Sequence, residues 1–325
     1  MSARNRGVAE STPTPGGLTG VGPVTSAVAP RRVARKATRR GPLAGWLMLA
    51  PAVAAYGFFV IYPFVLGVQY SFYDWNGVGT STFIGIDNYL RVFTDAEMLG
   101  SIRNAFVLII FFTVIPVSVG LVLATLIRNI RAGVFSTVSQ TILFLPQIIP
   151  LAAAGIAWSW MYAQTGTVNQ ILSAIGLGGI TRPWLAEYGF ALPAVGLIGS
   201  WVLTGLCTVL LLTGIGKIDT ALYEAIRLDG AGWFREFITI TIPGLRQQIA
   251  ILVTLTVIAA LSSFDIIYTT TRGGPGRETL VPGLSIFRIG FTQSDVGLAS
   301  AFGIVLMILV LIVVVPLQRL SRESK

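Results

Sequence analysis

The chain has 325 residues, of which 54% are hydrophobic and 11% are charged, whereas about 25% of residues are charged in an ordinary soluble domain. A mean hydropathy of +0.76 with so few charges would leave a soluble protein covered with exposed apolar patches. Several apolar runs approach or exceed the ~20 residues that a membrane-spanning helix needs. The composition therefore predicts an integral membrane protein and excludes a soluble enzyme.

The sequence contains no histidine, which excludes histidine-based catalytic triads, haem ligation and the usual catalytic zinc sites within this chain. The single cysteine, Cys207, can form no intrachain disulfide and cannot hold an iron–sulfur cluster alone. Its apolar surroundings predict a small packing residue. We therefore expect no metal or cofactor bound by this chain.

Residues 1–40 are rich in Gly, Pro, Ser, Thr and Ala and end in a basic run between Arg31 and Arg40. This composition predicts a disordered cytoplasmic tail that contacts anionic lipid. A signal peptide is the alternative interpretation, but its apolar region would have only 7–15 residues. The run from Leu43 to Tyr70 is longer and predicts a first membrane helix. Residues 41–325 then form the membrane domain.

Continuous rather than alternating apolarity predicts helices, because only helices or closed barrels satisfy the backbone in lipid. The predicted fold is therefore all-α, with six membrane-spanning helices at about residues 43–70, 105–127, 137–162, 191–214, 249–271 and 298–317. Pro146 and Pro150 predict a kink in the third span.

The distribution of basic residues predicts the orientation of the chain. With the N-terminus inside, 17 Lys and Arg residues lie in inner segments and 6 in outer segments. This bias is typical of the positive-inside rule and predicts a multi-pass protein of the cell membrane with both termini in the cytoplasm. It also accounts for the net charge of +9 without a nucleic-acid partner.

The inner loop at residues 215–248 is too long and too patterned for a simple connector. Asp219 or Thr220 can cap a short helix that carries Glu224 and Arg227 together on one face. Gly230 fits the left-handed residue that ends a helix, and a second short helix carrying Trp233, Phe234, Phe237 and Ile240 follows. Pro243 stops or kinks that second helix. Such an element suits docking into a groove of a partner protein, although an ordinary interfacial loop is equally consistent with the pattern alone.

This loop resembles the EAA motif of ABC importer permeases, in which E-A-A is followed by three residues, a glycine, nine residues and I-x-L-P. The matching residues are Glu224, Ala225, Asp229, Gly230, Ala231, Phe237, Ile240, Ile242 and Pro243. Ile226 replaces the second alanine of the motif and Ile242 replaces its leucine. Asp219 stands where many sugar permeases have proline.

The resemblance implies a type I ABC importer permease fold with the loop as a cytoplasmic coupling helix. Glu224, Ala225, Asp229, Gly230, Ala231 and Pro243 would then contact an ATPase subunit, whose closure on ATP would turn the bundle from inward-facing to outward-facing. No G-x-x-x-x-G-K-[ST] phosphate loop occurs, because the only Gly-Lys pair, Gly216-Lys217, lacks the upstream glycine. ATP and its magnesium are therefore expected on partner chains.

Further residues resemble the sugar-type permeases of the maltose and glycerol-3-phosphate group. They are Phe264-Asp265-Ile266-Ile267-Tyr268, Thr271, Gly273-Gly274-Pro275 and Thr279-Leu280, with Tyr62-Pro63, Phe83 to Tyr89, Phe144-Leu145-Pro146 and Trp184-Leu185 upstream. The resemblance implies a heterodimer with a second permease subunit, two ATPase subunits and an extracytoplasmic solute-binding protein that delivers the sugar. The predicted outer loops, each under 30 residues, could contact that protein.

Asp265 is the only ionisable residue inside the six predicted spans. It could accept a hydrogen bond from a sugar hydroxyl or act as a gate, or it could serve a helix cap or an interhelical bond. Trp201, Thr204, Ser262 and Ser263 are further candidates for the substrate path, because an aromatic face with hydroxyls suits a sugar ring. Against this, Ser and Thr commonly join helices in membranes.

The sequence thus predicts a non-enzymatic sugar permease of an ABC importer. A permease for a phosphorylated polyol such as glycerol-3-phosphate is the nearest alternative. A transporter driven by an ion gradient would need internal repeats and several intramembrane ionisable groups, and only Asp265 qualifies. A membrane enzyme would need a cluster of catalytic groups near one interface, and none is visible.

Overall fold

The computed structural model describes residues 42–129 and 133–323, so the predicted tail at residues 1–40 lies outside the described part of the chain. The chain divides into two compact units, Met1–Ala54 and Ala55–Lys325. The described part of the first unit belongs to helix α1 (Pro42–Tyr56), and its residues from Trp46 onward are exposed, as suits contact with lipid.

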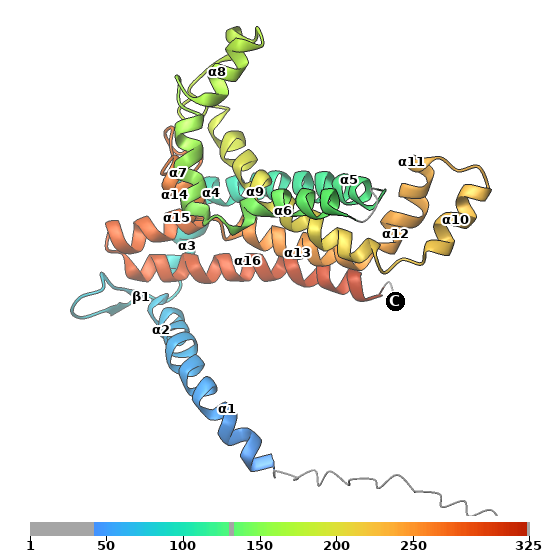
Figure 1. The fold of residues 1–325 in the computed structure, drawn as a ribbon. Helices are drawn as coiled ribbons and strands as arrows, with labels where there is room; N and C mark the ends of the chain where they lie inside the picture. The colour runs from blue at the N-terminus through green and yellow to red at the C-terminus, as the bar shows by residue number, and fades with distance from the viewer. Residues whose placement is uncertain (1–41, 130–132, 324–325) are drawn as a thin grey trace, which may run out of the picture. The chain divides into compact units, whose positions relative to one another are not determined.

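The second unit is almost entirely helical (Figure 1). Its α-helices are α2 (Tyr62–Tyr70), α3 (Asp87–Thr94), α4 (Ala96–Ile109), α5 (Ile115–Asn129), α6 (Val134–Ile148), α7 (Leu151–Met161), α8 (Thr167–Ala174), α9 (Ala191–Ile215), α10 (Thr220–Leu228), α11 (Trp233–Glu236), α12 (Ile242–Gly244), α13 (Arg246–Leu261), α14 (Asp265–Thr270), α15 (Pro282–Phe287) and α16 (Val296–Glu323). Short helical segments of other pitch are η1 (Gly57–Ile61), η2 (Ile110–Val114), η3 (Gly178–Ile180), η4 (Phe237–Thr241) and η5 (Arg288–Thr292). Two short antiparallel strands, β1 (Tyr73–Asp74) and β2 (Thr82–Phe83), pair Tyr73 with Phe83.

Four helices of the described chain are long and apolar enough to cross a membrane alone, at Trp46–Tyr70, Ala96–Arg128, Ala191–Ile215 and Val296–Arg319. Two bent helix pairs meet the same criterion together and bring the number of spans to as many as six. The predicted all-α membrane fold is therefore confirmed.

The first bent pair, Thr137–Ile148 with Leu151–Met161, turns by 96° within the predicted third span. The turn follows from Pro150, because a proline pushes the preceding residue out of the helical region. Ile149 is accordingly extended, with ψ 127°. Pro146 lies inside α6 without ending it, so the predicted kink is found at only one of the two prolines.

The second bent pair, Trp233–Gly244 with Arg246–Leu261, turns by 71°. Charged side chains such as Arg235 and Glu236 are costly in hydrocarbon, so we take the span to begin at Arg246 and the piece before it to lie outside the membrane.

The predicted fifth span, 249–271, is wrong as one continuous helix, since α13 ends at Leu261 and α14 begins at Asp265. Ser262 turns back on α13, with its Oγ donating to the carbonyl of Ile258 at 2.6 Å. Gly283 at the start of α15 approaches the break so closely that a Cβ there would lie 3.0 Å from the carbonyl oxygen of Ser263. The packing of α15 therefore accompanies a break that local composition does not signal.

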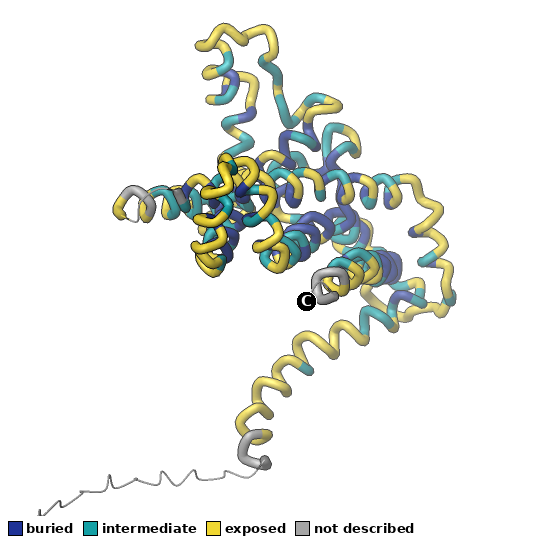
Figure 2. Tube along the Cα trace, turned by 90° about the vertical axis from the view of Figure 1, so that its right-hand side faces the viewer, coloured by how far each residue is buried: buried dark blue, intermediate teal, exposed yellow. Residues whose placement is uncertain are grey.

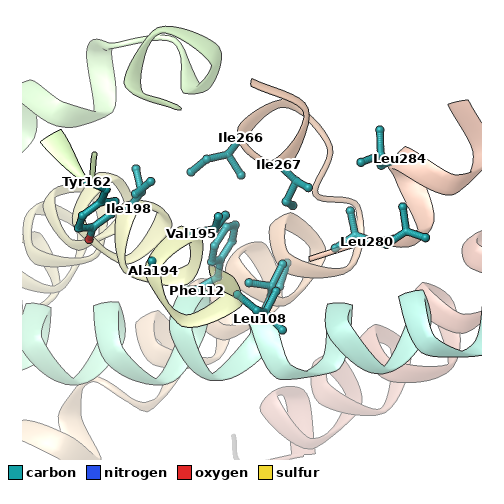
Figure 3. Close-up of a cluster of buried hydrophobic side chains, with 13 residues drawn as sticks. Leu108, Phe112, Tyr162, Ala194, Val195, Ile198, Ile266, Ile267, Leu280 and Leu284 are labelled. Carbon is teal, nitrogen blue, oxygen red and sulfur yellow. The ribbon is translucent and has the colours of Figure 1, made fainter. Parts of the chain in front are cut away.

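Buried residues gather where the helices of the second unit face one another, and the outward faces are exposed (Figure 2). One buried cluster joins α4, η2, the residue after α7, α9, α13, α14 and α15 (Figure 3); its labelled members include Leu108, Phe112, Val195, Ile267 and Leu284. A second cluster joins α5, α9 and α13 and contains Cys207, which is fully buried, as predicted for a packing residue.

Glycines let α9 approach its neighbours closely. A Cβ at Gly205 would lie against the backbone carbonyl oxygen of Leu143 in α6, and a Cβ at Gly120 in α5 would lie 2.9 Å from the Cβ of Cys207. Small residues at such positions are typical of helix packing in membranes. The close contact of α9 with α5 and α6 thus depends on the absence of a side chain.

We expect Gly205→Ala to lower the stability of the protein by about 1–3 kcal/mol, because a backbone carbonyl cannot rotate away as a side chain can. Gly303→Ala in α16 is the matched control, since nothing lies within 4 Å of its Cβ position and alanine favours a helix by about 0.5–1 kcal/mol. The melting temperatures of the two variants can be measured with a thiol-reactive dye, which reacts with Cys207 when heating exposes it. Equal melting temperatures for the two variants would contradict the prediction.

Candidate functional site

The segment between α9 and α13, residues 216–245, forms a helical lobe that we call the α10–α12 loop (Figure 1). Asp219 caps its first helix, because the Asp219 Oδ1 accepts a hydrogen bond from the backbone N–H of Ala221 at 2.9 Å. Of the two predicted caps, the structure therefore uses Asp219.

Helix α10 ends in a Schellman motif centred on Gly230. The N–H of Ala231 donates to the carbonyl of Ile226 at 3.1 Å, and the N–H of Gly230 donates to that of Arg227 at 3.0 Å. Gly230 has φ +76°, a left-handed conformation that side chains oppose. The predicted helix end is confirmed, and its geometry explains why a glycine stands at position 230.

An ion pair that the sequence did not predict joins the two arms of the loop. The Arg227 guanidinium donates to both carboxylate oxygens of Glu236, at 2.6 and 3.0 Å, whereas the expected neighbour Glu224 contributes only a weaker electrostatic attraction. The hydrogen bond from Arg227 holds the pKa of the Glu236 carboxyl below its usual range, so the pair remains charged near neutral pH.

A buried tyrosine makes the second link between the arms. Tyr223 is 2% exposed, and its hydroxyl forms a hydrogen bond of 3.1 Å with Thr241 in η4. At the end of the second arm, Pro243 precedes the fully buried Leu245, where the chain bends into α13. The helical piece thus ends close to Pro243, as predicted.

The outer surface of α10 is unoccupied by other described parts of the chain. Glu224, Ala225, Asp229 and Gly230 are exposed, as is the apolar Leu228, which is 89% accessible. A helix that is fixed on one side and open on the other can fit a groove of another protein.

A cavity of about 230 Å³ lies at the break between α13 and α14. Its walls come from η2, α7, α9 and α13–α14, and they include Phe112, Leu151, Gly199, Leu203, Ala259, Ser262, Ser263, Phe264, Asp265 and Ile266. Leu151 is the first residue of α7, so the break at Pro150 borders this cavity, as does the break at Ser262–Phe264.

Three of the five predicted substrate-path residues, Ser262, Ser263 and Asp265, line the cavity. Asp265 is the first residue of α14, so it lies at the start of a helix and not within one continuous span. Thr204 and Trp201 do not line it. The Thr204 hydroxyl donates to the carbonyl of Ser200 at 2.6 Å, and the ring of Trp201 lies 5.5 Å from that of Trp158.

Sequence reasoning missed Phe112, Leu151, Gly199 and Leu203 in the cavity wall, because each is an ordinary apolar or small residue in a long apolar run. The spacing of Gly196, Gly199 and Ser200 could have indicated close packing of the fourth span, and the Ser200 hydroxyl indeed donates to the carbonyl of Phe111 at 2.6 Å.

The apolar helices, the cavity at their breaks and the charged helical lobe together define a helical membrane transport subunit. The comparisons with known proteins identify its family. Residues 117–322 match the family described as the binding-protein-dependent transport system inner membrane component, to which this chain therefore belongs.

Two relatives and one solved structure illustrate the relationship. The probable ABC transporter permease protein YurN of Bacillus subtilis is 32% identical over 82% of this chain and 91% of its own length. The diacetylchitobiose uptake system permease protein NgcF of Streptomyces coelicolor is 32% identical over 81% of this chain and 78% of its own. A chain of a bacterial alginate ABC transporter, solved with an alginate pentasaccharide-bound periplasmic protein, has a TM-score of 0.74 and 25% identity, covering 86% of this chain and 94% of that one.

We expect Gly230→Ala to loosen the α10–α12 loop, because a left-handed alanine costs roughly 1–2 kcal/mol. Gly232→Ala is the matched control: neither glycine has an atom within 4 Å of its Cβ position, but Gly232 has φ −78°. Hydrogen exchange of residues 220–236 should accelerate only in the Gly230 variant, by about fivefold or more. Equal exchange in the two variants would show that the Schellman motif does not limit the opening of the loop.

Proposed function

We propose that this chain is the permease subunit of an ABC importer that carries a sugar or oligosaccharide across the cell membrane. The observation that carries this proposal is the α10–α12 loop, in which a capped and exposed helix is fixed to the bundle in a chain of this transport family. The exposed surface around Glu224, Ala225, Asp229 and Gly230 would dock into an ATPase subunit, with Ala231 and Pro243 holding its shape.

The chemistry of the cavity favours a neutral sugar as the substrate. The hydroxyls of Ser262 and Ser263 and the carboxylate of Asp265 can bond sugar hydroxyls, while Phe112 and Phe264 offer apolar faces. Its described lining contains a carboxylate but no lysine or arginine, which disfavours a phosphorylated polyol, since phosphate sites use cationic groups. The name of the relative NgcF, which refers to diacetylchitobiose, also points to an oligosaccharide.

The remaining partners follow from the same proposal. A cavity of about 230 Å³ is smaller than the usual 300–1,000 Å³ of a ligand site, so a second permease subunit would supply the opposite wall. Two ATPase subunits would hold ATP and magnesium, and an extracytoplasmic solute-binding protein would deliver the sugar. The basic residues then place both termini and the α10–α12 loop in the cytoplasm.

The complex of permease subunits, ATPase subunits and binding protein in proteoliposomes tests this proposal. The sugar to test is the one that the co-purified binding protein retains. We expect its uptake only when ATP is present on the side of the membrane that the α10–α12 loop faces. Uptake that survives complete ATP depletion would instead support a transporter driven by an ion gradient.

We expect Glu224→Lys to leave the chain inserted but to lower substrate-stimulated ATPase activity by about tenfold, equivalent to about 1.4 kcal/mol. The change reverses a charge on the exposed surface of α10. Arg319→Glu, a charge reversal at an exposed site near the end of α16, is the control and should retain activity. Full stimulation of the Glu224 variant would refute the coupling role.

We expect Ser263→Val to reduce ATP-driven uptake more than Thr204→Val. Both changes replace a hydroxyl side chain by valine, but only Ser263 lines the cavity. The loss of one hydrogen bond to a bound sugar would cost about 0.5–1.5 kcal/mol and appear as a raised substrate concentration at half-maximal uptake. An equal effect of the two variants would place the substrate path elsewhere.

A further inference from the structure

The end of the long helix that contains α5 contacts the α10–α12 loop through an arginine. Arg128 lies in the last turn of α5, and its guanidinium carbon lies 3.4 Å from the centroid of the Tyr223 ring. A cation over an aromatic face is attracted by the negative face of the ring. Tyr223 belongs to α10, is buried, and bonds to Thr241 in η4. Arg128 therefore contacts a buried side chain of the α10–α12 loop.

The same arginine acts on the second arm of the loop. Its positive charge helps to lower the pKa of the Glu236 carboxyl, after the larger contributions of Arg227. Because Arg227 joins Glu236 to α10 with two hydrogen bonds, the loop is closed as one body. Arg128 thus contacts the Tyr223 ring in α10 and adds a weaker electrostatic attraction to Glu236 in α11.

The helix that carries Arg128 also reaches the cavity wall and, near its other end, the segment that contains Leu280. Residues Ala96–Arg128 form one continuous span. Its Phe111 carbonyl accepts the hydrogen bond from Ser200 of α9, and its Phe112 lines the cavity. Near its other end, the Asn104 side chain donates to the carbonyl of Leu280 at 2.9 Å. A displacement of Arg128 along the helix axis would therefore move Phe112 in the cavity wall.

The covalent route from the loop to the bundle is less direct. The chain passes from α12 to α13 through a bend of 71° at Leu245. A bend that hinges would absorb part of any movement of the loop, whereas the continuous helix behind Arg128 has no such turn.

We propose that Arg128 is a positioning residue that makes the α10–α12 loop and the Ala96–Asn129 helix move together. Force applied to α10 then reaches the cavity through α5 and α9, in addition to the route through α13. The inference rests on the proposed function, because it requires an ATPase subunit that acts on α10.

The experiment measures sugar uptake per ATP hydrolysed in the reconstituted complex, together with the melting temperature reported by Cys207. Arg128→Gln removes the cation, and Arg128→Lys keeps a positive charge over the ring. Tyr223→Phe keeps the ring but removes the bond to Thr241. Arg319→Gln removes an exposed arginine for which the described residues show no ion pair, and it controls for the loss of a basic charge at a helix end.

We expect Arg128→Gln to lower uptake per ATP by about threefold to tenfold while substrate-stimulated ATP hydrolysis and the melting temperature stay near wild type. Arg128→Lys, Tyr223→Phe and Arg319→Gln should retain most of the wild-type ratio. Arg128→Met, which also removes the cation but keeps an unbranched side chain over the ring, should lower the ratio in the same direction. It serves as the decisive variant if Arg128→Gln does not accumulate.

Wild-type uptake per ATP in Arg128→Gln, or in Arg128→Met where the former does not accumulate, would overturn the inference. So would a loss that appears only together with a lowered melting temperature, or an equal loss in Arg319→Gln. A wild-type complex without ATP-driven uptake would overturn the proposed function as well, so the two failures are distinguishable.

Discussion

The structure depends on one constraint: a backbone N–H or carbonyl cannot be left without a partner inside lipid. Continuous helices satisfy it within themselves, and the interior of α9 does so. Where a helix breaks, the free groups must be buried in protein or face a polar cavity. The breaks at Pro150 and at Ser262–Phe264 border the same cavity, so the bundle gathers its irregular backbone in one place.

The two pieces beyond these breaks pack against each other. Helices α7 and α14 are neighbours, and a Cβ at Gly155 in α7 would collide with the side chain of Thr269 in α14. The close fit explains how short helices of 11 and 6 residues remain ordered at this depth. Short isolated helices are marginal, so their stability has to come from this mutual packing.

The amino-acid sequence predicted those features that depend on local chemistry. Apolar runs of sufficient length indicated the spans, Pro150 indicated a break, and Gly230 indicated the end of α10. Each of these follows from the conformational limits of one residue or one segment. The resemblance of the loop to the EAA motif supplied the family and the transport role, which composition alone could not.

Features that depend on distant packing were not predictable in the same way. The run from Ile249 to Thr271 is apolar throughout apart from its hydroxyl residues and Asp265, and the break within it is accompanied by the close approach of Gly283 in α15, which lies beyond the run. The partner of Arg227 lies across a turn at Glu236, beyond the three- and four-residue spacings that helical patterns make visible. Arg128 and Tyr223 are almost a hundred residues apart, and nothing in either neighbourhood signals their contact.

These unpredicted contacts have a common physical character, because each joins a residue at or near a helix end to a different helix or turn. Helix ends are where backbone groups lack partners and where side chains such as Arg128 remain free to reach outward. A bundle built from stiff helices can transmit movement only through such ends and through close contacts like that of α5 with α9. In the proposed function, the cavity at the breaks is therefore where substrate would bind, and the lobe beside the ends of α5, α9 and α13 is where movement would enter the bundle.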